Sequence, residues 1–171
     1  ISFQYVLNDG RTVEKLSVGK DGFVGVPFLF GETRFPCHAI TVISGSASWV
    51  SVHQFNDAMA RFSCIQPALQ SYTMRVLKQL MQAVVCASVH SASQRIATWL
   101  LFANDRSQAS SFDITQRTLA NIFGLRLATV GDACAKLGAA GAIDHSRGTM
   151  SDADRGALDR QACECYQAVR S

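Results

Sequence analysis

The periodicity of apolar residues along the chain changes near residue 53. Before that point, short β-branched and aromatic runs alternate with turn residues, beginning with residues 1–7 and 12–18. Asp9 and Gly10 lie between these two runs and predict a type I′ hairpin, because both residue types tolerate positive φ angles. Further strands are expected at residues 39–43 and 48–52. This half therefore predicts an antiparallel β-roll of the jelly-roll type.

From Gln54 onward the apolar spacing changes to about 3.6 residues, and a long helix is expected from near Pro67 to about Val89. One apolar stripe has alternating spacings of four and three residues, interrupted by Gln79, as in the seam of a two-helix coil. We expect this stripe to form a homodimer interface, and it consists of Ile65, Leu69, Tyr72, Val76, Ala83 and Cys86.

A second apolar face runs beside the first on the same helix, and it consists of Leu77, Leu80, Met81 and Val84. A helix with two apolar faces needs two partners. We expect one partner to be the β-domain and the other a twin subunit. The alternative is that both faces are buried inside one monomer.

The remaining boundaries follow from breaks in these patterns. Residues 90–93 interrupt the helical pattern, after which a helix is expected over residues 94–102 and a polar loop over residues 104–111. We therefore expect a partial β-roll sensor domain at residues 1–60, a dimerisation helix at 61–90 and a third domain at 91–171. Because a strand already begins at Ile1, which is not a methionine, the first strands of the roll are expected to be missing.

Residues 112–143 contain two short amphipathic helices with the spacing of a helix-turn-helix. The small Ala120 lets the two helices cross closely, and Val130 fills the angle between them. Thr115 is a suitable N-cap for the first helix, and Gly124 can adopt the left-handed conformation that ends it. Residues 138–149 then read as a strand, a glycine turn and a return strand, which together predict a wing. Helical hairpins in enzymes can mimic this spacing, and the wing and the preceding long helix favour DNA binding.

Composition narrows the function further. The net charge is only +3, from 16 basic and 13 acidic residues, so charge alone does not indicate nucleic acid. The apolar runs at residues 24–30 and 80–87 are too short to cross a membrane. We therefore expect a cytoplasmic protein that has no membrane partner.

The cysteines and histidines give little support for metal or catalytic chemistry. Of the six cysteines, only Cys163 and Cys165 come close together, and this single Cys-x-Cys is weak support for zinc. We expect free thiols in a reducing cytosol and no metal site. The four histidines have no metal-ligand spacing and no nucleophile motif is evident, so an enzyme on a cupin-like scaffold is not expected.

The order of these elements resembles the Crp/Fnr family of bacterial transcriptional regulators. The most specific stretch is residues 114–137, which begins Ile-Thr-Gln-Arg-Thr-Leu-Ala and is similar to the family pattern I-T-x-x-x-L-A-x-x-x-G-x-S-R-E-T-V-x-R-x-x-x-x-L. The resemblance implies an α+β fold: an antiparallel β-roll like a cyclic-nucleotide-binding domain, a long dimerisation helix and a winged helix-turn-helix. It also implies a homodimer that binds double-stranded DNA and can contact RNA polymerase.

Residues that normally read bases in the family are replaced in this chain. Leu127 and Asp132 stand where the pattern has arginines, Ala128 where it has glutamate, and Arg126 where it has serine. By resemblance, phosphate and groove-edge contacts remain, while Leu127 or Ala128 could contact a thymine methyl and Asp132 a cytosine amino group. We therefore expect DNA binding with an atypical sequence preference through Thr115, Gln116, Arg117, Arg126, Leu127, Ala128, Thr129, Asp132, Lys136, His145 and Arg147.

The expected effector remains an unidentified small molecule. Cyclic-nucleotide binders of the family carry a Gly-Glu and an Arg-Ser pair, whereas here Val26-Pro27 follow Gly25 and Cys37-His38 precede Ala39, so cyclic AMP is not expected. Arg34 and His38 are the candidate ligand contacts. Scattered thiols give no support for an iron-sulfur cluster, and haem is likewise unsupported. The alternative function is a degenerate family member that acts through protein or ligand contacts and binds DNA weakly or not at all.

Overall fold

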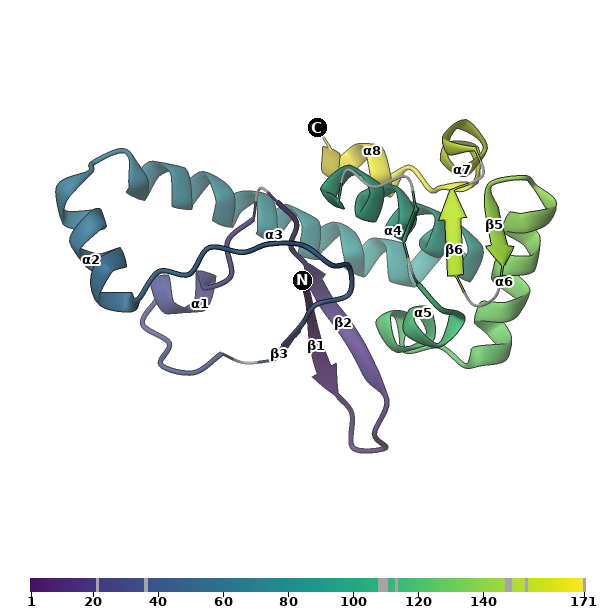
Figure 1. Cartoon of the computed structure of the whole chain (residues 1–171), viewed down its shortest axis with the longest axis horizontal. Coiled ribbons are helices and arrows are strands. Elements are labelled where there is room, and N and C mark those ends of the chain that lie inside the picture. The colour runs from purple at the N-terminus through teal and green to yellow at the C-terminus, as the bar shows by residue number, and fades with distance from the viewer. Residues whose placement is uncertain are drawn as a thin grey trace.

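The computed structural model describes residues 1–20, 22–35, 37–107, 111–112, 114–146, 149–152 and 154–170. Figure 1 shows a long helix, α3 (Ile65–Val89), that links an N-terminal half with a small sheet to a C-terminal half in which helices surround a second sheet. The mixed α+β architecture predicted from the sequence is confirmed. No described helix combines the length and the apolarity needed to cross a membrane.

The N-terminal half contains an antiparallel sheet with strand order β2-β1-β3. It is formed by β1 (Ser2–Val6), β2 (Thr12–Ser17) and β3 (His38–Ile40). The predicted β1–β2 hairpin is confirmed, and Gly10 has a φ of 82° at its turn. The reversal spans three residues rather than the two of a type I′ turn, because Leu7 N–H donates to Arg11 O across residues 8–10. The short helix α1 (Val26–Leu29) lies between β2 and β3 in the sequence.

The strand expected at residues 48–52 is wrong. That segment has no regular structure up to Ser51, where helix α2 (Val52–Arg61) begins, and Trp49 is 94% exposed. Ser51 and Gln54 form a capping box, in which each side chain bonds the backbone N–H of the other. β-Branched residues alone did not make a strand, because in the described sheet no neighbouring strand pairs with this segment.

Helix α3 begins and ends where the sequence predicted. Pro67 lies in its first turn, where its missing N–H costs nothing, and His90 follows its last residue. None of its side chains is fully buried. The helix therefore has polar and apolar surfaces that are accessible to a partner.

The C-terminal half holds nearly all of the described core. It runs α4 (Ala92–Ser107), β4 (Ser111–Phe112), α5 (Gln116–Phe123), α6 (Leu127–Ala139), β5 (Ile143–Ser146), β6 (Thr149–Asp152), α7 (Arg155–Gln161) and α8 (Cys165–Arg170), with sheet order β4-β6-β5. Side chains from α4, α5, α6 and α7 meet in one cluster that includes Ile96, Leu100, Leu119, Val130, Leu137 and Leu158. The pairing of β5 with β6 confirms a wing, but its strands lie later than the residues 138–149 that the sequence predicted, because α6 continues to Ala139.

Helix α4 is longer than the sequence predicted. Residues 104–107, expected in a polar loop, form its last turn. Asp105 in this turn bonds Arg155 and Tyr166, and the Arg106 guanidinium lies over the Phe102 ring. Tertiary partners therefore hold polar residues in a helix that their composition alone did not favour.

Candidate nucleic-acid interface

The turn between α5 and α6 is built from local signals that the sequence carries. The Thr115 hydroxyl accepts a hydrogen bond from Thr118 N–H at 3.0 Å, which confirms the predicted N-cap. Gly124 has a φ of 63°, so the left-handed residue that ends α5 is also confirmed. Val130 is fully buried between the helices as expected.

Helix α6 has one buried and one exposed face. Val130, Ala133, Cys134 and Leu137 face the core. The predicted DNA contacts are all exposed, on the opposite face and at the amino end, and they are Arg126, Leu127, Ala128, Thr129, Asp132 and Lys136. The fold thus brings together on one accessible surface the α6 residues that the sequence analysis assigned to DNA.

The amino end of α6 is arranged to attract an anion. Arg126 occupies the N-cap position without a side-chain capping bond, and the first turn carries no acidic residue. The backbone N–H groups of the first turn have no partner within a helix, and the helix dipole adds partial positive charge there. The guanidinium of Arg126 adds a full charge beside them. A DNA phosphate is a ligand that this end of the helix can bind.

The other predicted DNA contacts lie on α5 and the wing. Thr115 and Arg117 are exposed and Gln116 is half-buried. The Gln116 Oε1 atom would lie 3.4 Å from a Cβ added at Gly131, so this side chain lies close to α6. The His145 backbone pairs with Met150 in the wing, whereas the His145 side chain and all of Arg147 lie outside the described residues.

The candidate ligand contacts in the N-terminal half do not converge on a pocket. Arg34 and His38 are both exposed. A pocket of about 230 Å³ lies elsewhere, between β2, α3, α4 and α5, and its lining includes Glu14, Gln82, Trp99 and Ile122 but neither Arg34 nor His38. The prediction that these two residues bind an effector stays a prediction.

The stripe assigned to the dimer interface faces its own chain. Ile65, Leu69, Tyr72, Val76 and Cys86 are half-buried, while Ala83 is exposed and helps line the pocket. Contacts within the chain account for part of this burial: the Tyr72 hydroxyl donates to Phe23 O at 3.2 Å, and Cys86 lies against Cys163.

The second apolar face of α3 is the one open to a partner. Leu77, Met81 and Val84 are 46%, 63% and 67% exposed, and Leu80 is exposed as well. The second face is thus more exposed than the predicted stripe, and the assignment of the stripe to a dimer interface stays a prediction.

A cluster of thiols that the sequence analysis did not foresee lies where α3 meets α8. Cys86 on α3 and His90 directly after it face Cys163 and Cys165, and the four potential ligand atoms lie within 4.8 Å of one another. Burial raises the pKa of the Cys86 thiol, and the neighbouring Cys163 and Cys165 raise it further. Burial likewise raises the pKa of Cys165. The spacing of four residues between Cys86 and His90 was the available signal, because it places both on one helix face.

The fold and the exposed face of α6 define a winged helix-turn-helix protein. Residues 94–160 match the Crp-like helix-turn-helix domain. The resemblance to the Crp/Fnr family is thus confirmed for the match of this segment to the Crp-like domain, and the chain as a whole is similar in fold to solved structures of Crp/Fnr-family regulators. None of the curated protein sequences matches the chain.

Three solved structures illustrate the likeness in fold. FixK2 from Bradyrhizobium japonicum aligns at a TM-score of 0.63 with 18% identity, over 95% of this chain and 82% of its own. A CRP-family transcriptional regulator from Thermus thermophilus aligns at 0.64 with 19% identity, over 94% and 82%. A Crp/Fnr-family regulator from Eubacterium rectale aligns at 0.64 with 13% identity, over 94% and 75%.

Proposed function

We propose that this protein is a DNA-binding transcription regulator that acts as a homodimer and inserts α6 into the major groove. The exposed and uncapped amino end of α6 carries this proposal. Its backbone N–H groups and Arg126 can bind phosphate, while Leu127 and Ala128 stand beside them with side chains accessible to base edges.

The specificity of this surface differs from that of an arginine-reading helix. Leu127 is 47% exposed and can contact a thymine methyl group, whereas the Asp132 carboxylate can accept from a cytosine amino group. The same carboxylate repels phosphates, so Asp132 disfavours any register that brings it to the backbone. Binding thus depends strongly on the phosphate contacts of Arg126, Lys136 and α5, and on the salt concentration.

The dimer is proposed to form through the outward face of α3. Met74, Leu77, Met81, Val84 and Ser88 follow one another at spacings of three, four, three and four residues, which is the period of a coiled-coil seam. Met74 is 53% exposed, like its apolar neighbours on this face. In the N-terminal half the described residues bury few side chains fully, namely Ser2, Phe3 and Val18, so this half lacks the core that a partner can supply. A twofold dimer would place its two α6 helices about 34 Å apart, one turn of B-DNA.

An effector is proposed to act on the junction between the halves. Thr12 Oγ1 donates to Asn121 O, and Arg11 Nη1 donates to Gly124 O, so the β1–β2 hairpin touches the α5 end of the helix-turn-helix. The pocket of about 230 Å³ adjoins this contact. A small molecule that binds there with different affinity in two arrangements would shift the position of α6. The effector itself and the contact with RNA polymerase stay predictions.

Selection from random duplex DNA, followed by fluorescence anisotropy at about 50 and about 200 mM salt, tests the proposal. We expect an enriched half-site unlike the usual family site. Arg126→Glu should weaken binding to all sequences and lower the salt slope by about two per dimer, one for each lost phosphate contact. Arg61→Glu on α2 makes the same charge change away from α6 and should leave both unchanged.

Two results would overturn this assignment. If the dimer ignores duplex DNA even at low salt, the chain fits the alternative of a module that acts through protein contacts. If Arg61→Glu and Arg126→Glu weaken binding equally, the effect is one of net charge and α6 is not the binding surface.

A further inference from the structure

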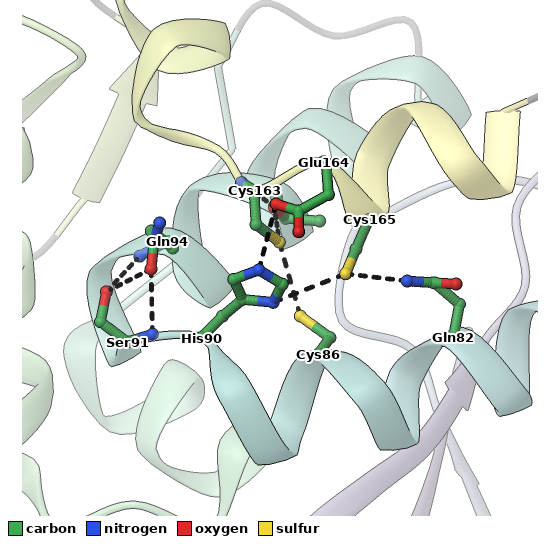
Figure 2. Close-up of polar contacts among 9 residues, drawn as sticks. Gln82, Cys86, His90, Ser91, Gln94, Cys163, Glu164 and Cys165 are labelled. Atoms are coloured by element: carbon green, nitrogen blue, oxygen red, sulfur yellow. Dashed lines mark hydrogen bonds and ion pairs between the residues drawn. The ribbon is translucent and has the colours of Figure 1, made fainter.

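The thiol cluster joins segments that are distant in sequence. Cys86 and His90 lie one turn apart at the carboxyl end of α3, while Cys163 and Cys165 lie just before and at the start of α8. Figure 2 shows the two cysteines descending from the α8 segment toward the imidazole and the Cys86 thiol. One imidazole and three thiols therefore surround a common point between two helices of different halves.

The spacing of the donor atoms fits a tetrahedral ion. Zinc binds sulfur at about 2.3 Å and nitrogen at about 2.0–2.1 Å, so a regular tetrahedron has edges of about 3.8 Å between sulfurs and about 3.6 Å between sulfur and nitrogen. Cys86 Sγ and Cys163 Sγ are 3.6 Å apart, and Cys165 Sγ and His90 Nδ1 are also 3.6 Å apart. The distance between the two sulfurs is far longer than a disulfide bond, which is about 2.05 Å.

The groups around the cluster orient the donors as they do in metal sites. His90 Nε2 lies 3.1 Å from Glu164 Oε2, so with the proton on Nε2 it donates to the carboxylate and leaves Nδ1 as the free donor atom facing Cys165. A carboxylate behind a ligating histidine is the common outer contact of zinc sites.

Two of the three sulfurs also have polar partners outside the cluster. Gln82 Nε2 donates to Cys165 Sγ at 3.0 Å, and Thr98 Oγ1 lies 3.1 Å from Cys163 Sγ. Because the Thr98 oxygen already accepts from Cys163 N–H, its own hydroxyl proton is available to the sulfur. Such donors are suited to the thiolate form, in which cysteine binds a metal ion.

We propose that Cys86, His90, Cys163 and Cys165 bind one Zn²⁺ ion that fastens the end of α3 to the start of α8. All four positions come from the protein, which is the closed arrangement of a structural rather than a catalytic zinc site. The converging donors, all within 4.8 Å, fit a single ion rather than a multi-iron cluster. The ion fixes the angle between the helix proposed to form the dimer and the domain proposed to bind DNA.

Metal content of the full-length chain, purified without an affinity tag that binds metal, tests this site directly. We expect one zinc per chain by mass spectrometry. After chelation, Co²⁺ should restore one ion per chain with visible bands typical of tetrahedral thiolate coordination. Cys163→Ser and His90→Ala should each reduce tight binding to below a tenth of an ion per chain. Cys64→Ser, which changes an exposed cysteine just before α3, should keep the full ion.

The stability of the wild type gives a second measurement that does not depend on the folding of any variant. At an ion concentration about a thousandfold above its Kd, removing zinc should lower the Tm by roughly 8–16 °C, and adding zinc back should reverse the loss. Neither measurement uses DNA, so failure of the zinc site and failure of the proposed DNA binding are distinguishable.

Several outcomes would overturn the zinc site. The zinc site is wrong if the wild-type protein binds neither Zn²⁺ nor Co²⁺ at micromolar concentration. It is also wrong if Cys163→Ser and His90→Ala both retain the metal. Iron with sulfide in the purified protein would replace the proposal with an iron-sulfur cluster. A Cys86–Cys163 disulfide that is present in the metal-free purified protein and persists in reducing buffer would replace it with a redox pair.

Discussion

At Gly124 the two halves of the molecule approach so closely that there is no room for a side chain. A Cβ atom built there would lie 2.7 Å from Val13 Cγ2, on β2 of the N-terminal sheet. The same residue has a φ of 63°, a backbone conformation that costs free energy for any residue with a Cβ. One glycine thus ends α5 and allows the sheet to dock on it.

Gly124→Ala should destabilise the protein by about 2–4 kcal/mol, the sum of a left-handed alanine and an overpacked contact. Urea unfolding followed by circular dichroism measures this loss. Gly45→Ala is the matched control, because nothing lies within 4 Å of its added Cβ. Adding Val13→Ala to Gly124→Ala should remove the steric part and leave the backbone part. A Gly124→Ala variant as stable as Gly45→Ala would contradict this account.

Asp105 on α4 forms hydrogen bonds to the C-terminal helices, and their contribution to stability depends on pH. Burial raises the pKa of its carboxyl, but the hydrogen bonds from Tyr166 at 2.7 Å and Arg155 at 2.6 Å outweigh burial and lower it. A carboxyl with a lowered folded pKa stabilises the protein fully above its unfolded pKa of about 4. That stability is lost as pH falls through the lower folded value.

Asp105→Asn should therefore cost about 1–2 kcal/mol at pH 7, a modest value because the carboxylate is partly exposed. The difference from wild type should shrink as pH falls from about 5 to below 4. Chemical denaturation at a series of pH values measures it. A difference that stays constant down to about pH 3 would show that the contribution of Asp105 is not carried by its charge.

The residues of the helix-turn-helix were predictable because their roles are set by near neighbours. Thr115 bonds a backbone group three residues away, and Gly124 and Val130 act within one turn of the helices they join. The need for glycine at Gly124 had a second cause that no local pattern shows, since Val13 lies 111 positions earlier in the sequence, the difference between 124 and 13.

At the scale of elements, periodicity predicted α3 and its two apolar faces but not which face meets which partner. A stripe of apolar residues has the same spacing whether it packs on its own chain or on another copy. Tyr72 and Cys86 find partners within the chain, whereas Met81 and Val84 remain exposed. The failed strand at residues 48–52 has the same origin, because a strand exists only where another strand pairs with it.

Met81→Lys combined with Val84→Lys should convert the proposed dimer to a monomer, because two buried lysines per helix would face their counterparts across the seam. Sedimentation velocity measures the assembly. Ala68→Lys adds one lysine on the α3 face that also carries Arg75, one heptad later, and should leave the dimer intact.

DNA affinity gives an independent check on this face of α3. The double variant should bind DNA about a hundredfold or more weakly, since a monomer binds through one α6 rather than two. If the double variant remains a dimer, the dimer forms through another surface of the chain.

At the scale of the whole molecule, two of the junctions among the described residues hold the C-terminal half to the rest. Near α8 the thiol cluster meets α3, and near α5 the β1–β2 hairpin meets the helix-turn-helix. At the junction near α5, Trp99 Nε1 donates a hydrogen bond to Glu14 Oε1 at 2.9 Å, across 85 residues of sequence. Neither junction could be predicted, because contacts between distant segments leave no periodic trace in the residues that make them.

Glu14 is the residue through which the second junction is best tested. Its Oε1 accepts from Trp99, while its Oε2 is buried without a hydrogen-bond partner among the described residues. Glu14→Ala leaves the indole N–H unpaired and should cost about 1–3 kcal/mol. Glu14→Gln keeps an acceptor for Trp99, so it should lose less stability than Glu14→Ala.

Trp99 itself can report where the loss occurs. The chain has two tryptophans, and in a Trp49→Phe background only Trp99 emits. Without the Glu14 change, unfolding followed by Trp99 fluorescence and by circular dichroism should coincide, because one cooperative unit contains both halves. With Glu14→Ala, the fluorescence transition should move to lower urea than the helical signal, since the hairpin leaves α4 before the C-terminal core unfolds. Coincident transitions in both proteins, together with equal stabilities of the Ala and Gln variants, would show that this hydrogen bond does not couple the halves.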